Sequence, residues 1–386
     1  MTRPRFFPVV LAGAAAFLDI YATQPILPLL MRLVGGSHFA VSLTVTAPTL
    51  AVALAAPVIG RVADLVGRKR VIVGSAIGLT VVTALSATAT SLPQFIAWRF
   101  VQGLLTPGIF AITIAYIQDE FSAPQAARAS GAYVAGTVSG GFVGRTIVGL
   151  VAAQAGWRVS FVTLALVNLA TAVGLALWLP ADTARARPTG RAGHGESAWR
   201  LLRDRQLMAT NVVGFCVLFS LVAMFTNVTF YLSEAPFLLS TGALAWLFVV
   251  YLVGAGVVPI TGRTIGKLGY RSTHVSGMAC SAMGALLTLV PSLGAVVVGL
   301  ALVGTGVFIA QATASSYIGV VTANDRGLAV GLYSTAYYLG GTLGGTLPSL
   351  FWSRGGWPAC VALVLGVQVV SVVMVLKFWR VDRPLA

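Results

Sequence analysis

Three charged residues lie inside long apolar stretches of the sequence and are the first candidates for chemistry. Asp19 is the only acid deep in such a stretch, and Arg99 and Arg145 are the bases. A charge inside a membrane span is costly unless it faces protein or water, so each position is a functional candidate. With a rise of about 1.5 Å per residue, Asp19 and Arg99 fall at the same depth of a bilayer. The two could handle a proton together or form a purely structural ion pair.

Arg99, Gln102 and Gly103 share one face of a predicted helix, because they stand at positions i, i+3 and i+4. The alternative for Arg99 is a side chain that snorkels to the membrane surface, since Pro93 marks a nearby end of the span. Arg145 follows the ridge Gly136, Gly140 and Gly144, whose small residues let helices approach closely. Close packing explains these glycines but not the arginine.

A turn motif between two apolar stretches reads Gly60-Arg-Val-Ala-Asp64-Leu-Val-Gly67-Arg68-Lys69-Arg70. Its glycines allow a tight turn between packed helices, and its acid can bind an arginine or a helix N-terminus. The alternative is that the basic residues only anchor the loop to anionic lipid. That alternative leaves the acid and the glycine spacing unexplained.

Signatures of enzymes are absent from the sequence. No Gly-x-x-x-x-Gly-Lys-Ser/Thr loop is present to hold a nucleotide phosphate, and His38, His194 and His274 have no metal-ligand spacing. The three cysteines lie in apolar runs and indicate no disulfide framework. We therefore expect no enzymatic activity, no cofactor and no metal.

The elements that position these residues must be membrane-spanning helices. Of the 386 residues, 57% are hydrophobic and 9% charged, and the mean hydropathy is +0.90. A water-facing surface needs far more charge. The apolar pattern at the N-terminus runs through Leu30, so we interpret it as an uncleaved first helix rather than a signal peptide. Twelve spans are expected, at residues 6–31, 40–60, 71–90, 93–117, 129–152, 158–179, 207–233, 243–262, 272–290, 293–316, 328–350 and 358–379.

The net charge of +15 is distributed as in a membrane protein, not as in a nucleic-acid-binding protein. Most Lys and Arg fall in alternate loops and at the two ends, whereas the complementary loops hold only Arg32, Arg158 and Arg354. This positive-inside bias predicts that both termini are cytoplasmic.

An internal repeat divides the chain into two halves. Gly140-Gly141-x-x-Gly144 recurs as Gly340-Gly341-x-x-Gly344, and Gly156-Trp157 recurs as Gly356-Trp357. The turn motif recurs from Gly262, with Gly266 in place of the acid, so acidic gate chemistry is expected in the first half only. We predict two pseudo-symmetric six-helix bundles, residues 1–180 and 207–386, joined by a flexible cytoplasmic linker at 181–206.

These motifs resemble those of the major facilitator superfamily. The turn motif is similar to the family's Gly-x-x-x-Asp-Arg/Lys-x-Gly-Arg-Arg/Lys signature, with Leu65 at its first basic position, and Arg99-x-x-Gln102-Gly103 is similar to that of proton-coupled members. The stretch from Tyr21 through Gln24-Pro25 to Pro28 resembles the first span of bacterial drug and sugar efflux permeases. Its prolines are expected to kink the outer end of that span.

The resemblance implies how such a chain would work. Substrate would bind between two parallel repeats near the bilayer midplane. Asp19 and Arg99 would couple transport to protons, because the family's spans 1 and 4 line the central cavity. Gly60, Asp64, Gly67, Arg68 and Lys69 would form a cytoplasmic gate. The Gly-Pro pair of family antiporters is replaced by Gly140-Gly141 here.

The expected function is export of a small amphipathic compound in exchange for protons, from a bacterial inner membrane and as a monomer. Proton-driven nutrient uptake and a non-transporting receptor or scaffold are the alternatives. The partners would be the substrate, protons and the bilayer, without nucleic acid. Polar and aromatic residues within the spans are the candidates for the substrate cavity: Tyr21, Gln24, Gln102, Arg145, Asn227, Trp246, Gln311, Tyr317, Tyr333 and Tyr337.

Overall fold

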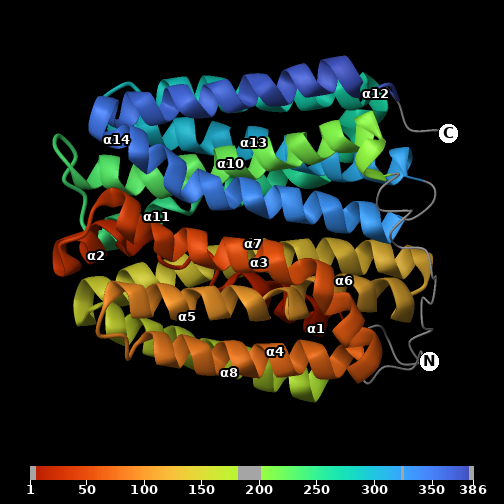
Figure 1. Ribbon diagram of the computed structural model, residues 1–386, viewed down its shortest axis with the longest axis horizontal. Helices are drawn as coiled ribbons and strands as arrows, with labels where there is room; N and C mark the ends of the chain where they lie inside the picture. Colours follow the sequence, from red (N-terminus) through yellow and green to blue (C-terminus); the bar gives the residue numbers. More distant parts are fainter. Residues whose placement is uncertain (1–5, 181–200, 323–325, 382–386) are drawn as a thin grey trace. The chain divides into compact units, whose positions relative to one another are not determined.

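The computed structural model describes residues 6–180, 201–322 and 326–381, and this part of the chain is helical without a strand. Within it, eight helices are long and apolar enough to cross a membrane, and shorter apolar helices accompany them. The chain forms two compact units: Met1–Thr189 with Leu239–Phe248, and Gly190–Leu238 with Val249–Ala386 (Figure 1). The expected linker lies outside the described residues over 181–200, so the boundaries 1–180, 181–206 and 207–386 stay a prediction.

The first unit holds the first six predicted spans. Its first span is broken into three pieces, and its fourth consists of two consecutive helices that share one apolar stretch, Leu92–Glu120. The elements in chain order are α1 (Phe7–Phe17), η1 (Gln24–Ile26), α2 (Leu27–Val34), α3 (His38–Val66), α4 (Arg68–Ser86), α5 (Leu92–Leu105), α6 (Pro107–Glu120), α7 (Ala123–Ala155) and α8 (Trp157–Trp178).

The second unit holds the last six spans, apart from the beginning of the span predicted at 243–262, in four long helices: α10 (Arg205–Ser233), α12 (Val250–Leu287), α13 (Leu293–Val321) and α14 (Arg326–Phe378). Two of these helices contain two spans each. α12 is interrupted at Gly269, where φ is 81°, and α14 at Gly356, where φ is 56°. Glycine adopts this left-handed backbone without steric cost. The twelve-helix fold predicted from the sequence is therefore confirmed.

The sequence repeat corresponds to a repeat in packing within each unit. A Cβ added to Gly140 on α7 would lie 2.3 Å from the carbonyl oxygen of Ala14 on α1. A Cβ added to Gly340 on α14 would lie 2.0 Å from the carbonyl oxygen of Phe215 on α10. Both glycine ridges thus allow backbone-to-backbone contact, as small residues do between membrane helices.

One predicted span differs from the structure. A continuous helix was expected over residues 243–262, but α11 (Thr241–Leu247) and α12 are separated by a turn at Phe248 and Val249. α11 packs against α7 in the first unit, where a Cβ added to Gly149 would lie 2.4 Å from the Cβ of Ala245. Packing on α7 therefore ends this helix where hydropathy alone would continue it.

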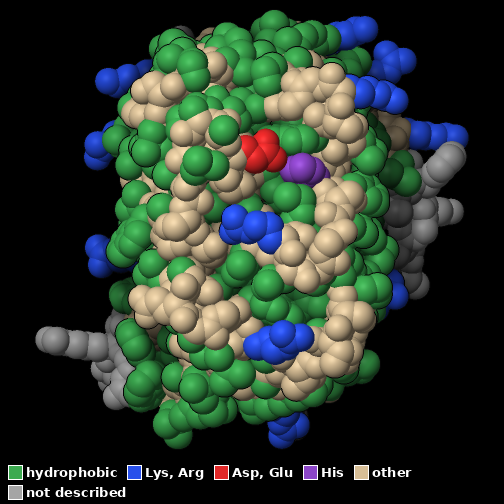
Figure 2. All heavy atoms as spheres, turned by 90° about the vertical axis from the view of Figure 1, so that its left-hand side faces the viewer, with side chains coloured by type: hydrophobic (Ala, Val, Ile, Leu, Met, Phe, Trp, Pro, Cys, Tyr) green, Lys and Arg blue, Asp and Glu red, His purple; other side chains and the backbone are tan. Residues whose placement is uncertain are grey.

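Large hydrophobic side chains are exposed along helices of both units. Leu166 and Leu177, both on α8, are 62% and 71% exposed. Figure 2 shows the face at the ends of the helices, where Lys or Arg, acidic and histidine side chains lie among hydrophobic ones. Exposed apolar side chains along the length of a helix are typical of a membrane-facing surface in a chain of this composition.

Candidate functional site

The first span is interrupted where its candidate acid stands. α1 ends at Phe17, residues 18–23 form turns that include Asp19, and the chain resumes as η1 at Gln24. Pro25 has no N–H to continue the helical ladder. The span is interrupted as predicted, but the break begins at residue 18, several residues before the outer end where the prolines stand. The break exposes main-chain carbonyls to neighbouring helices.

Arg99 on α5 satisfies these carbonyls. Its Nη2 donates to the carbonyl oxygens of Asp19 at 2.8 Å and Ile20 at 2.7 Å. Its Nε donates at 3.0 Å to the carbonyl of Thr44, which lacks its helical donor because Pro48 stands four residues later in α3. No part of the side chain is exposed. Arg99 is thus enclosed in protein rather than snorkelling to the membrane surface.

The Asp19 carboxylate is held by uncharged side chains. Its Oδ1 accepts hydrogen bonds from the Thr83 hydroxyl at 2.8 Å and from Gln102 Nε2 at 3.4 Å. Its Oδ2 accepts one from Asn168 Nδ2 at 2.8 Å. Gln102 also accepts from Arg99 Nη1 at 2.5 Å, so its amide connects the acid to the base. Among the described residues the two charges meet through Gln102 and the Asp19 main chain, without a direct ion pair.

Sequence reasoning missed two members of this buried network, Thr83 on α4 and Asn168 on α8. Both belong to no motif, and each is an uncharged polar residue in an apolar span. The weak signal available was that Asn168 is the only amide in its predicted span. Asn168 is 1% exposed, and its Oδ1 has no hydrogen-bond partner in the described part of the chain. The network therefore contains an acceptor that a protonated Asp19 could use.

A second buried arginine lies beside the same broken span. Arg145 on α7 donates from Nε to Gln24 Oε1 at 2.7 Å and from Nη1 to the carbonyl of Gly141 at 2.6 Å. Its guanidinium lies 5.1 Å from the ring centroids of both Tyr21 and Phe248. The structure thus brings together three predicted cavity residues and adds Phe248, which the sequence did not identify.

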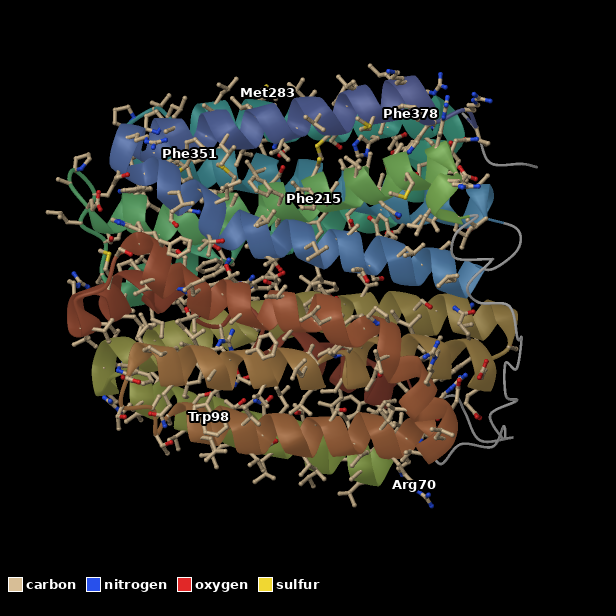
Figure 3. All side chains as sticks on the ribbon, in the orientation of Figure 1. Arg70, Trp98, Phe215, Met283, Phe351 and Phe378 are labelled. Atoms are coloured by element: carbon tan, nitrogen blue, oxygen red, sulfur yellow. The ribbon has the colours of Figure 1, made fainter. Side chains whose placement is uncertain are left out.

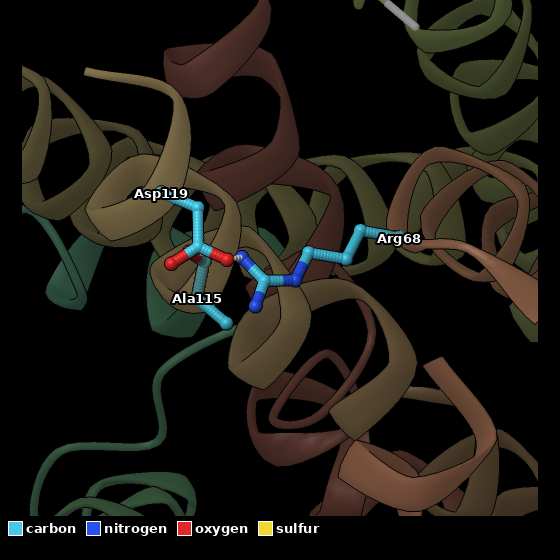
Figure 4. A network of polar contacts seen from close by, with 3 residues as sticks. All are labelled: Arg68, Ala115 and Asp119. Carbon is cyan, nitrogen blue, oxygen red and sulfur yellow. Dashed lines mark hydrogen bonds and ion pairs between the residues drawn. The ribbon is translucent and has the colours of Figure 1, made fainter. Parts of the chain in front are cut away.

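The turn motif adopts the tight connection that its glycines allow. Gly67 has φ 98° and ψ 143° between α3 and α4. Arg68 forms an ion pair with Asp119 and donates to the carbonyl of Ala115 at 2.6 Å, both on α6 (Figure 4). Asp64 lies in the last turn of α3 and is exposed within the first unit. The sequence interpretation gave this acid the main role and missed Asp119, which is one of two acids at the end of the fourth span.

In the second unit, three candidate residues form one cluster. The Tyr333 hydroxyl on α14 donates to Gln311 Oε1 on α13 at 2.9 Å. The rings of Tyr333 and Tyr337 stack with centroids 6.0 Å apart. Gln311 Nε2 also donates to Ser315 at 3.3 Å. This cluster is the polar aromatic patch of the second unit.

The remaining cavity candidates lie in different surroundings. Tyr317 is buried, stacks on Trp379 with centroids 4.0 Å apart and donates to Gln206 Oε1 at 2.8 Å. Asn227 is fully buried and donates to the carbonyl of Ala223, four residues earlier. Trp246 is 55% exposed on α11.

Within the described ranges, no three His, Cys, Asp or Glu side chains cluster so that they could hold a metal ion. Cys216, Cys280 and Cys360 are not disulfide-bonded. The polar side chains of the described interior include arginine, amide and hydroxyl groups around one carboxylate in the first unit, and His274 in the second unit, which is hydrogen-bonded to Ser371 at 2.9 Å.

Comparisons with known proteins agree on one family. The family model described as Major Facilitator Superfamily matches residues 9–318 and 235–386. The inner membrane transport protein YnfM of Escherichia coli (strain K12) is 30% identical over 385 residues, covering 98% of this chain and 92% of that protein. The MFS-type transporter YybF of Bacillus subtilis (strain 168) is 29% identical over 356 residues, covering 92% and 88%.

A solved structure shares the fold. It is that of a bacterial homolog to the human lysosomal transporter Spinster, in an inward-facing and occupied conformation. The TM-score is 0.71 with 16% sequence identity, and the alignment covers 96% of this chain and 93% of that one.

Proposed function

The chain belongs to the major facilitator superfamily, and from that premise we propose that it exports a small amphipathic compound in exchange for protons by alternating access. As a member it is a multi-pass membrane transporter, which is not an enzyme class. The observation that carries the proposal is the buried carboxylate of Asp19, 1% exposed and enclosed by Thr83, Gln102 and Asn168. No other acid is buried in the described part of the chain.

The network gives both protonation states of Asp19 a set of partners. The ionised carboxylate accepts three hydrogen bonds and lies near the positive charge of Arg99. The protonated acid needs an acceptor, which Asn168 Oδ1 would supply after rotation of its amide. Protonation would therefore rearrange contacts among α4, α5, α8 and the broken span. A contact change of this kind can shift the balance between two conformations.

The proton gradient supplies enough energy for such a cycle. One proton moved fully across a potential of 100 mV is worth about 2.3 kcal/mol. This free energy drives exchange only if protonation alters the relative stability of the inward-facing and outward-facing conformations. In this proposal Asp19 meets that requirement because its hydrogen bonds connect the broken first span to α4, α5 and α8.

Arg145 is the proposed substrate contact in the first unit, with Tyr21 and Gln24 beside it. The buried charged side chains of the described residues are one carboxylate, Asp19, and two guanidinium groups, Arg99 and Arg145, a surplus of one positive charge. A cationic compound would add to this repulsion in a medium of low dielectric constant. We therefore propose that the compound is neutral or anionic. Gln311, Tyr333 and Tyr337 would contribute the surface from the second unit.

The topology of the proposal follows the charge distribution. The two bundles, residues 1–180 and 207–386, would be joined by a cytoplasmic linker at 181–206, with both termini on the same side of a bacterial inner membrane. Asp64 would help to close the cytoplasmic side, and the protein would work as a monomer.

The deciding experiment compares wild type with Asp19→Asn. A compound is first found by its stabilisation of the purified protein in a thermal-shift screen. Wild type should release protons when the compound is added, and should accumulate it in energised inverted vesicles. Asp19→Asn should lose both and retain binding.

The other outcomes separate the alternatives. Exclusion of the compound from inverted vesicles, together with proton-driven uptake in right-side-out vesicles, would favour a nutrient symporter. Binding without proton movement in wild type would favour a receptor. Proton release and uphill transport by Asp19→Asn would place the coupling acid elsewhere.

A further inference from the structure

A surface groove of about 680 Å³ lies on the first unit between α4 and α8. These two helices pack side by side in Figure 1. Lys69 and Arg70 line one end of the groove, and Gly74 and Ile77 continue along α4, with Ala176 on α8 opposite. The groove thus combines a basic end with an apolar trough on the membrane-facing side of the unit.

The basic end is suited to an anion. Arg70 is exposed and points away from the helices at the end of α4 in Figure 3. No acidic partner of Arg70 is present among the described residues, whereas its neighbour Arg68 is paired with Asp119. Three consecutive basic residues occupy the first turn of α4. Positive charge there is opposed by the helix dipole, which favours an anion at this position.

The apolar end is suited to a hydrocarbon chain. A Cβ added to Gly74 would meet no atom within 4 Å, so this glycine leaves the floor of the trough open. Ile77 is 51% exposed beyond it. Seven residues of helix separate Arg70 from Ile77, a length of about 10 Å. Trp178 ends α8 two residues after Ala176 and is 45% exposed, as tryptophans at the membrane–water interface are.

We propose that this groove is a binding site for an anionic phospholipid. Its phosphate contacts Lys69 and Arg70 at the interface, and one acyl chain runs over Gly74 towards Ile77. A basic pocket between helices at a membrane surface recognises such headgroups by charge, and the apolar floor holds the chain by burial. The site is separate from the buried network around Asp19 and does not depend on proton coupling.

The test is native mass spectrometry of the full chain in detergent, titrated with phosphatidylglycerol or phosphatidylcholine of identical acyl chains. Wild type should bind phosphatidylglycerol more tightly. Arg70→Gln should weaken phosphatidylglycerol binding about fivefold, which corresponds to about 1 kcal/mol per basic side chain. It should weaken phosphatidylcholine binding less, because the choline ammonium offsets the charge of that lipid's phosphate. Gly74→Leu should weaken both lipids, because its side chain fills the trough.

Two matched controls separate the groove from general surface effects. Lys377→Gln removes an exposed charge from the last turn of α14, and Gly366→Leu fills open space at an exposed glycine of the same helix. Neither should alter lipid preference. Equal affinity of wild type for the two lipids would overturn the proposal, as would an Arg70→Gln protein that keeps the wild-type preference. Arg70 is exposed, so its variant remains decisive if Gly74→Leu does not fold.

Discussion

Arg99→Ala should destabilise the protein as well as impair transport, because Arg99 donates hydrogen bonds to carbonyls that lack a helical N–H donor. Arg99 donates to the carbonyls of Asp19, Ile20 and Thr44. In the variant, the carbonyl of Asp19 would still accept a hydrogen bond from the main-chain N–H of Ala22. The Thr44 carbonyl has lost its helical donor to Pro48, and that of Ile20 receives no main-chain bond in the described part of the chain. Two buried carbonyls would therefore be left without a donor.

The size of the effect follows from that count. A buried polar group left unsatisfied costs about 1–3 kcal/mol, so two carbonyls give about 2–6 kcal/mol. Counting all four hydrogen bonds of Arg99 at the average measured between membrane helices, about 0.6 kcal/mol each, gives about 2.4 kcal/mol. Both routes predict a loss of at least about 2 kcal/mol.

The assay is reversible unfolding of the purified protein in mixed micelles. Arg32→Ala, an exposed arginine on α2 in the same unit, serves as the control and should stay within about 0.5 kcal/mol of wild type. Arg99→Lys should lie between wild type and Arg99→Ala, since an ammonium keeps the charge but not the planar fork. A loss of unfolding free energy below about 1 kcal/mol for Arg99→Ala would show that water or a shifted backbone satisfies these carbonyls. It would refute the idea that Arg99 is needed as their donor.

Four further predictions test other parts of the molecule. Asp64→Asn should strongly impair transport while leaving insertion and folding intact, and near-normal transport would show that this acid is dispensable. The ion pair of Arg68 with Asp119, whose side chains are 19% and 44% exposed, should give a coupling below about 1 kcal/mol in a double-mutant cycle; a larger value would mean that the pair is shielded from water. Gly140→Val should lower the unfolding free energy by about 1–3 kcal/mol through contact with the Ala14 carbonyl, and an unchanged unfolding curve would contradict the close packing. Reporter fusions should place residues 61–70, 180–206 and 263–271 inside and 32–39 and 153–157 outside, and a periplasmic signal near residue 195 would refute this topology.

The fold was predictable because a membrane imposes simple requirements on sequence. A span must be apolar over its length, since lipid cannot hydrate charges or free main-chain groups. The twelve spans and the glycine repeat follow from composition and spacing alone. The exceptions are local: α11 ends at Leu247 because it packs on α7, and no hydropathy window contains that neighbour.

The candidate site was predictable in part, for a related reason. A buried charge in an apolar span is conspicuous, so Asp19, Arg99 and Arg145 could be identified from the sequence. Of the three side chains that hold Asp19, Gln102 belongs to a motif, whereas Thr83 and Asn168 could not be identified, because they stand 64 and 149 residues away along the chain. Helical periodicity determines which residues share a face, but not which helix packs against that face. The sequence by itself therefore determined that an acid is buried here, and the tertiary structure decided that amide and hydroxyl groups, rather than a direct ion pair, surround it.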